Sequence, residues 1–302
     1  MNLPGHLLGW FFWTREVALA VLGEVKSIVE FIDVVRKATK PAPGGVAAFR
    51  GQQNKEWKLQ PGLLRAPQKH LHHEREMSRD LMAIHPQEFA ADQTMFDRLV
   101  RMQHYGLRTR LLDVTLNPLV ALYFAVQRAQ SGGRPVDGAV WLIRAPPSRK
   151  KYFDSDAVSC VSNLANLSAI EKDEIRNVPT SYSKDLFNEV DAVDKLLQFI
   201  RAEKAYFRAQ IDRDDFFKRY LVTPKMSNRR IIAQSGAFVI FGLELPPSAA
   251  KFPDTIKTDR IDIPEGAKTE IRAELDTLGI NESTLFPELD RAASYIMRRY
   301  SS

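Results

Sequence analysis

Residues 109–118 read TRLLDVTLNP and continue into LVALYFA at residues 119–125, and this stretch decides the fold prediction. Within it, Asn117-Pro118 predicts the start of a helix, because proline fits the first helical turn, where its missing N–H group leaves no hydrogen bond unmade. We predict that this helix covers residues 119–129 and ends before Gly132-Gly133. The stretch therefore brings polar residues to the N-terminus of a largely apolar helix.

Short apolar runs on both sides of this helix predict strands. The four runs are residues 46–50 (VAAFR), 139–143 (AVWLI), 237–241 (AFVIF) and 260–263 (RIDI). Such runs, bounded by Gly, Pro or polar residues, are typical of strands in a folded domain. The run at 139–143 is apolar throughout, which indicates a strand that is covered on both faces.

Several segments have the periodicity of amphipathic helices. Residues 27–38 begin with Ser27 and have Glu30 three residues later, a capping box. We predict further helices over 74–84, 94–105, 189–207 and 265–278. Residues 145–228 are mostly polar and helical in pattern with no convincing strand, so we expect a mainly helical insertion or cap. Since strands occur on both sides of it, the fold class is α+β, with one domain over residues 27–302.

The composition excludes several classes of protein. The chain has 302 residues, of which 44% are hydrophobic, so it is not a disordered or low-complexity protein. Cys160 is the single cysteine, which excludes a disulfide framework and multi-cysteine metal sites and favours a reducing compartment. A net charge of +6 indicates only a mild preference for anionic partners.

The N-terminal residues 1–26 are strongly apolar, but Arg15 and Glu16 interrupt them before they reach the roughly 20 apolar residues of a membrane span. They also lack the basic start and the cleavage site of a signal peptide. We expect a hydrophobic helical extension that packs on the domain or a partner, with contact at a membrane surface as the alternative. No transmembrane segment is expected, and the cytoplasm is the favoured location.

Four short stretches carry a resemblance to a known family. They are FRGQ at 49–52, MQHYG at 102–106, the long motif at 109–125 and QSGAF at 234–238, linked by WKLQP at 57–61 and by Arg65. Together they resemble the FRG-domain family, from about Ser27 to the C-terminus. Arg108 and Val114 stand where that family usually has Pro and often has Trp.

FRG domains are in turn distantly similar to ADP-ribosyltransferases, which bind NAD in a cleft between two antiparallel sheets. This resemblance implies a core of mostly antiparallel strands with a cleft and flanking helices. It also implies that Arg50 holds the dinucleotide, that Thr115 lies on a strand leading into a helix, and that Gln234 lies near the reacting ribose. It assigns Gly51, Gln52, Gln103, Tyr105 and Asp113 to dinucleotide binding, and His104 to catalysis with Thr115 and Gln234.

The transfer of ADP-ribose from NAD requires residues of these chemical types. Cleavage between nicotinamide and ribose creates an oxocarbenium-like centre, so a site must hold the diphosphate and stabilise positive charge on the sugar. The planar fork of Arg50 suits the diphosphate, although an arginine at a strand end is also a common surface residue. His104 suits a ribose hydroxyl or a general base, or it satisfies a loop. Gln234 orients a hydroxyl but is no base.

Other features have simpler explanations. Asp113 and Thr115 also suit N-capping of the following helix, a position that attracts phosphate too. His70, His72 and His73 match no helical zinc motif, so we expect no metal. The basic stretches at 144–151 and 225–230 are either solvated loops or contacts to a nucleic-acid backbone.

These observations predict an NAD-dependent ADP-ribosyltransferase that acts on a macromolecule, either protein or nucleic acid. Its expected role is that of a bacterial toxin or anti-phage defence effector, with NAD as substrate and a cognate antitoxin or partner chain as a further partner. The alternative is a non-catalytic module that uses the same cleft and its basic loops to bind nucleic acid or protein. The missing carboxylate at Gln234 favours the alternative.

Overall fold

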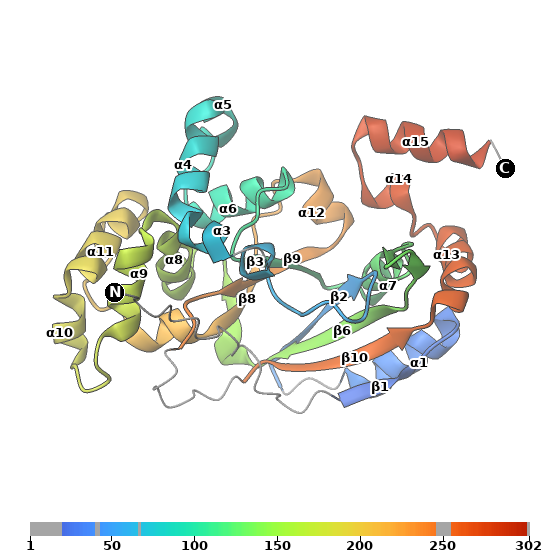
Figure 1. Cartoon of the computed structure of the whole chain (residues 1–302), viewed down its shortest axis with the longest axis horizontal. Coiled ribbons are helices and arrows are strands. Elements are labelled where there is room, and N and C mark those ends of the chain that lie inside the picture. Colours follow the sequence, from blue (N-terminus) through green and yellow to red (C-terminus); the bar gives the residue numbers. More distant parts are fainter. Residues whose placement is uncertain (1–19, 40–42, 66–67, 246–254, 301–302) are drawn as a thin grey trace, which may run out of the picture.

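The computed structural model describes residues 20–39, 43–65, 68–245 and 255–300, and its centre is one large mixed sheet (Figure 1). The strand order is β1-β10-β6-β2-β3-β9-β8-β7. These strands are β1 (Ala20–Glu24), β2 (Val46–Gln52), β3 (Leu111–Thr115), β6 (Gly138–Ala145), β7 (Lys150–Tyr152), β8 (Arg219–Thr223), β9 (Gly236–Phe241) and β10 (Lys257–Ile263). The pairs β1–β10 and β7–β8 are parallel and the others are antiparallel, as expected. A short hairpin, β4 (Gln130–Ser131) and β5 (Arg134–Pro135), stands apart.

The sheet is weakly joined at its centre. Strands β2 and β3 pair through Phe49 and Thr115 alone, whereas β2 pairs with β6 along its whole length. Beyond that pair the two strands diverge toward Gln52 and Leu111. The molecule therefore has two half-sheets that meet at one point, in place of the two separate antiparallel sheets that the resemblance implies.

Helices cover one face of both half-sheets, and the chain closes the other face with shorter segments. The longer helices are α1 (Ile28–Ala38), α4 (Glu74–Ile84), α6 (Met95–His104), α7 (Pro118–Ala125), α8 (Asp156–Asn163), α9 (Ala169–Asn177), α11 (Asp191–Glu203), α13 (Lys268–Thr277) and α15 (Leu289–Arg299). The shorter ones are α2 (Gly62–Arg65), α3 (Gln68–His72), α5 (Pro86–Phe89), α10 (Lys184–Asn188), α12 (Arg229–Ala233) and α14 (Glu282–Leu285). In Figure 1, α8 to α11 gather at one end of the sheet, and α1 and α13 at the other.

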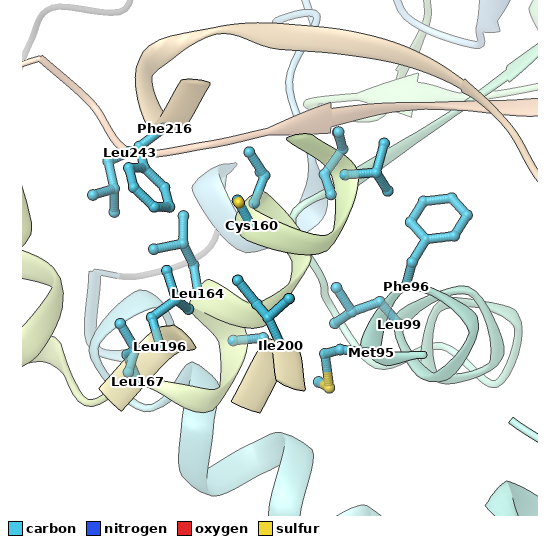
Figure 2. Packing of buried hydrophobic residues seen from close by; sticks show 14 of the residues in the cluster. Met95, Phe96, Leu99, Cys160, Leu164, Leu167, Leu196, Ile200, Phe216 and Leu243 are labelled. Carbon is cyan, nitrogen blue, oxygen red and sulfur yellow. The ribbon is translucent and has the colours of Figure 1, made fainter. Parts of the chain in front are cut away.

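Each half-sheet has its own core on the helical face. Helices α6, α8 and α11 pack on β3, β8 and β9, and Figure 2 shows Met95, Phe96 and Leu99 of α6 facing Ile200 of α11. Cys160 lies in this core and is buried, and burial raises the pKa of its thiol, so it is a packing residue. Helices α1, α7 and α13 pack on β2, β6 and β10 in a second core.

Many of the predicted elements are confirmed. Helix α1 begins after Ser27, whose hydroxyl accepts a hydrogen bond from the N–H of Glu30, so the N-cap forms as predicted. The reciprocal bond of the predicted capping box does not form, because the Glu30 carboxylate accepts from the N–H of Lys26 instead of that of Ser27. The strand predicted at 139–143 lies within β6 and is buried on both faces. Helices α4 and α6 match the ranges predicted for them within one residue at each end.

Three predictions need correction. Residues 145–228 are not free of strands, because Arg219–Thr223 form β8 and Lys150–Tyr152 form β7 at the edge of the sheet. These strands are short and flanked by charged residues, so they show no long apolar run. Helix α7 ends at Ala125 rather than at residue 129, before the β4–β5 hairpin begins at Gln130.

The third correction concerns the expected helical extension over residues 1–26. Residues 20–24 are a strand that pairs in parallel with β10, and residues 1–19 lie outside the described part. Without β1, strand β10 would be an edge strand with unpaired backbone groups, and pairing in β1 supplies partners for the backbone of residues 20–24 as well. Among the described residues, no helix has the length and apolar character needed to cross a membrane.

A buried ion network joins α4, β3 and α9. The guanidinium of Arg110 donates to both carboxylate oxygens of Glu74, and Lys172 Nζ donates to Glu74 Oε2 at 2.7 Å. Arg110 also donates to the carbonyl of Phe241 on β9 at 2.8 Å. Burial by itself raises the pKa of Glu74, but Arg110 and Lys172 outweigh it and hold that pKa at about 2. This network fixes β3, which carries the central motif.

Candidate functional site

A cavity of about 450 Å³ lies where β2 and β3 diverge. Eight of the nine predicted site residues line it: Arg50, Gly51, Gln52, Gln103, His104, Asp113, Thr115 and Gln234. They come from β2, α6, β3 and the end of α12, which are far apart in the sequence. The volume is within the range of about 300–1,000 Å³ that is typical of ligand pockets. The structure therefore brings the predicted residues to one place.

Arg50 spans the gap between the diverging strands. Its Nη1 donates to the backbone carbonyl of Asp113 at 2.6 Å and lies 3.9 Å from the Asp113 carboxylate. Its side chain is only 19% exposed, and its buried Nε has no hydrogen-bond partner within the described chain. Burial lowers the pKa of Arg50, and the Asp113 carboxylate opposes that effect. A buried guanidinium nitrogen without an acceptor lowers the stability of the folded protein, unless a ligand in the cavity supplies that acceptor.

Arg65 interacts electrostatically with both Arg50 and Arg108, although neither Arg65 nor Arg108 lines the cavity. Burial lowers the pKa of Arg65, and the nearby charge of Arg108 lowers it further, while Asp113 raises it. Arg65 in turn lowers the pKa of Arg50. Arg50 and Arg65 thus both interact with the carboxylate of Asp113, which leaves an excess of positive charge to attract an anion.

Among the residues that the structure describes, Asp113 is the only carboxylate residue that lines the cavity, and Gln103 holds it in place. The amide of Gln103 donates to Asp113 Oδ2 at 2.7 Å and to the carbonyl of Leu111 at 3.1 Å. The hydroxyl of Thr109 donates to Gln103 Oε1 at 2.6 Å. With its hydrogen bonds made inside the protein, Gln103 positions Asp113 rather than a ligand. Asp113 itself is 57% exposed and does not cap α7, where Asn117 is the N-cap.

The side chains of Thr115 and Gln234 make hydrogen bonds within the protein. Thr115 Oγ1 donates to the backbone carbonyl of Gln234 at 2.7 Å and accepts from the N–H of Asn117 at 3.0 Å. The amide of Gln234 donates to the carbonyl of Leu285 in α14 at 3.0 Å. These contacts join β3, the end of α12 and α14. Both residues lie at the cavity as expected, but their polar groups support its walls.

His104 lies at the cavity edge between a carboxylate and a guanidinium. Its Nε2 is 3.9 Å from Glu288 Oε1. Burial lowers the pKa of His104, and Arg230 lowers it further, while Glu288 raises it. The imidazole is therefore neutral at pH 7 and has one nitrogen able to accept a proton.

Gly51 and Gln52 serve the architecture of β2. A Cβ atom at Gly51 would lie 1.8 Å from the backbone oxygen of Ala121, so only glycine lets α7 lie this close to β2. Gln52 is buried and accepts a hydrogen bond from Trp141 Nε1 at 2.8 Å. Both residues line the cavity, and their contacts explain their identity without a ligand.

Tyr105 differs from the other predicted residues, because it lies outside this cavity and lines a neighbouring one. The sequence placed Arg230 in the basic stretch 225–230 but not in this cavity, which Arg230 lines with its guanidinium 4.8 Å from the ring centroid of Phe286. Arg230 precedes Gln234 by four residues, about one helical turn, and that spacing was the available signal. Within the described part of the chain, no three His, Cys, Asp or Glu side chains gather into a metal-binding cluster.

Comparison with known proteins agrees with the central motifs. Residues 46–133 match the family model described as the FRG domain. This range runs from β2 to the β4–β5 hairpin and contains Arg50, His104, Asp113 and Thr115, but not Gln234. A search of curated proteins and one of solved structures found no match. Over residues 46–133, therefore, this chain carries an FRG domain.

Proposed function

We propose that the cavity binds NAD and that the protein is an ADP-ribosyltransferase acting on a macromolecular target. The observation that carries the proposal is the buried Arg50 Nε, which has no partner among the described residues and lies at the wall of a cavity where motifs from four parts of the chain meet. Arg65 lies outside the cavity lining and adds positive charge near Arg50. A diphosphate supplies acceptor oxygens for Arg50 and negative charge for the cluster.

The proposed reaction needs two further roles. The bond between nicotinamide and ribose breaks with its electron pair leaving on nicotinamide, and the acceptor nucleophile then bonds to the ribose carbon. Asp113 is the lining carboxylate that stabilises the positive charge of the transition state, which removes the need for a carboxylate at Gln234. Neutral His104 takes the proton of the acceptor nucleophile and releases it to water.

This proposal places the protein in the cytoplasm as a toxin or an anti-phage effector, because depletion of NAD or modification of a host macromolecule harms the cell. A non-catalytic module that uses the same cleft is the second candidate. The observation in its favour is that Thr115 and Gln234 use their polar groups within the protein. Such contacts keep a cavity rigid but take no part in bond cleavage.

Purified protein incubated with labelled NAD and a whole-cell lysate separates the candidates. For the transferase, label moves to a macromolecule and nicotinamide is released in equal amount. Release of nicotinamide without a labelled macromolecule identifies a hydrolase. Absence of both products, with or without NAD binding, contradicts the transferase and supports the non-catalytic module, whose ligand is nucleic acid or protein.

Arg50→Ala is expected to weaken NAD binding by about 10- to 100-fold, the usual loss when a charged hydrogen-bonding group is removed. Isothermal titration calorimetry on folded protein measures the change in Kd. Arg36→Ala is the matched control, because Arg36 is an exposed arginine of α1 that pairs with Asp33. Equal affinities for Arg50→Ala and Arg36→Ala would remove the basis of the proposal.

Asp113→Asn is expected to keep the Kd for NAD within a few-fold of the wild-type value and to reduce the rate of nicotinamide release by about 100-fold. The reason is that the amide keeps the shape of the carboxylate but lacks its charge. The rate of nicotinamide release under NAD saturation measures the reduction. In the same assay, Gln234→Glu tests whether a carboxylate at residue 234 can take the role proposed for Asp113. If Asp113→Asn retains full activity, Asp113 is not the stabilising carboxylate.

A further inference from the structure

A second cavity of about 510 Å³ adjoins the first and has no role in the proposed NAD site. Four residues line both cavities: Val100, His104, Asn228 and Ile231. The second cavity lies between α6 and residues 224–231, and Figure 1 shows α12 and the end of α6 together above β3 and β9. Because His104 belongs to both walls, a ligand in the second cavity lies next to the proposed reaction centre.

The charges in the second cavity favour an anionic ligand. Its two carboxylates are already paired: Asp92 accepts from Arg101 Nε at 2.7 Å, and Asp97 accepts from Lys225 Nζ at 2.9 Å. Arg229 lies at the rim, is exposed, and forms no ion pair within the described part of the chain. After pairing, the lining keeps the positive charge of Arg229, and Arg230 adds another in the adjoining first cavity.

Aromatic rings continue from the second cavity along the surface, and Tyr105 and Tyr152 are exposed, whereas Phe153 is partly buried against the core. Tyr105 lines the second cavity, is 64% exposed, and has its ring centroid 5.1 Å from that of His104. On the other side, Lys225 Nζ lies 4.9 Å from the ring centroid of Phe153. Tyr152 comes next, is 57% exposed, and has Lys150 Nζ 5.9 Å from its ring centroid.

Strand pairing holds these groups in one row. Tyr152 is opposite Thr223 in the β7–β8 pair, and the N–H of Phe153 donates to the carbonyl of Thr223 at 3.0 Å. Pro224 and Lys225 follow directly and line the second cavity. The row therefore runs from Lys150 and Tyr152 through Phe153 and Lys225 to Arg229 and Tyr105, and it contains three cations and three aromatic rings. We call it the Tyr152–Tyr105 track.

We propose that the Tyr152–Tyr105 track binds single-stranded nucleic acid and that the second cavity seats one of its nucleotides beside His104. Cations that follow a phosphate backbone, interleaved with exposed rings on which bases stack, are the features of single-strand binding. No sequence preference is expected from stacking and backbone contacts alone. That this nucleotide is the ADP-ribose acceptor rests on the proposed function, whereas the binding itself does not.

Fluorescence anisotropy of the whole chain with a labelled 12-nucleotide oligouridylate tests the track. Tyr105→Ala and Arg229→Ala are each expected to weaken binding by about tenfold, and Arg229→Ala is expected to reduce the slope of log Kd against log salt by about one. The matched controls are Tyr206→Ala and Arg36→Ala, exposed residues outside the track, which are expected to leave Kd unchanged. A duplex of the same length is expected to bind more weakly.

Absence of binding at low salt would overturn the proposal, as would equal losses in the track variants and the controls. Arg50→Ala is expected to keep oligonucleotide binding, because Arg50 lies only in the first cavity. Binding of the oligonucleotide without any reaction of NAD supports the track and contradicts the proposed function. Transfer of label from NAD to protein, without oligonucleotide binding, supports the transferase and overturns the track.

Discussion

Glu74→Gln is expected to destabilise the fold by about 3–5 kcal/mol, the usual cost of removing one partner from a buried ion network. Glu74, Arg110 and Lys172 are all buried, and the carboxylate faces both cations. The amide keeps the shape of the side chain but leaves two positive charges without compensation. Because Arg110 belongs to the central motif next to β3, the loss also loosens the wall that carries Asp113 and Thr115.

Urea unfolding followed by circular dichroism measures this loss. Glu76→Gln is the matched control, since Glu76 lies on the same helix, is partly exposed, and pairs with Arg75 at the surface. It is expected to change the free energy of unfolding by about 0.5 kcal/mol or less. Replacing Glu74, Arg110 and Lys172 together by apolar residues of similar size is expected to recover much of the stability. If Glu74→Gln and Glu76→Gln are equally stable, the network is not a determinant of the fold.

The same network predicts how stability depends on pH. The pKa of Glu74 is about 2 in the folded protein and has a reference value of 4.5, so folding favours the ionised form. Its contribution is complete above pH 4.5 and decreases as the pH falls from 4.5 toward 2. The wild-type protein is therefore expected to lose stability over this range more steeply than Glu74→Gln does. Parallel acid titrations of the two proteins, monitored by thermal unfolding, measure the difference.

Local signals predicted many of the elements. Ser27 with Glu30 marked the start of α1, and Asn117-Pro118 marked that of α7, because caps depend on neighbouring residues alone. The apolar run in β6 identified a strand buried on both faces. The sequence did not show β1 or β8, because Ala20–Glu24 and Arg219–Thr223 become strands through pairing with β10 and β9. Their local patterns alone are weak.

The members of the candidate site were predictable, but their individual roles were not. Arg50 and His104 come together because β2 and β3 diverge, a feature of tertiary pairing that no local pattern shows. The partners of Thr115 and Gln234 lie 119 and 51 residues away in the sequence, so their use as supports became visible only in the fold. Glu288 approaches His104 from the C-terminal segment, and no sequence motif pointed to it.

Gly51→Ala is expected to destabilise the protein by about 3 kcal/mol or more, because the added Cβ meets the backbone of a neighbouring helix. It would lie 1.8 Å from the oxygen of Ala121 and 2.7 Å from the nitrogen of Ala125, and no side-chain rotation relieves a contact with backbone. Helix α7 must then move away from β2, which separates Arg50 from Asp113 at the junction of the half-sheets. We expect a loss of NAD binding in the fraction that remains folded.

Two glycine variants control this prediction. Gly138→Ala is expected to act in the same direction, since its Cβ would lie 2.2 Å from the oxygen of Ala125, on the β6 side of the same helix. Gly266→Ala is expected to be neutral or slightly stabilising, because nothing lies within 4 Å of its added Cβ. Thermal unfolding of the three variants side by side measures the effect. Equal melting temperatures for Gly51→Ala and Gly266→Ala would contradict the prediction. They would mean that the close packing of α7 on β2 does not determine the shape of the cavity wall.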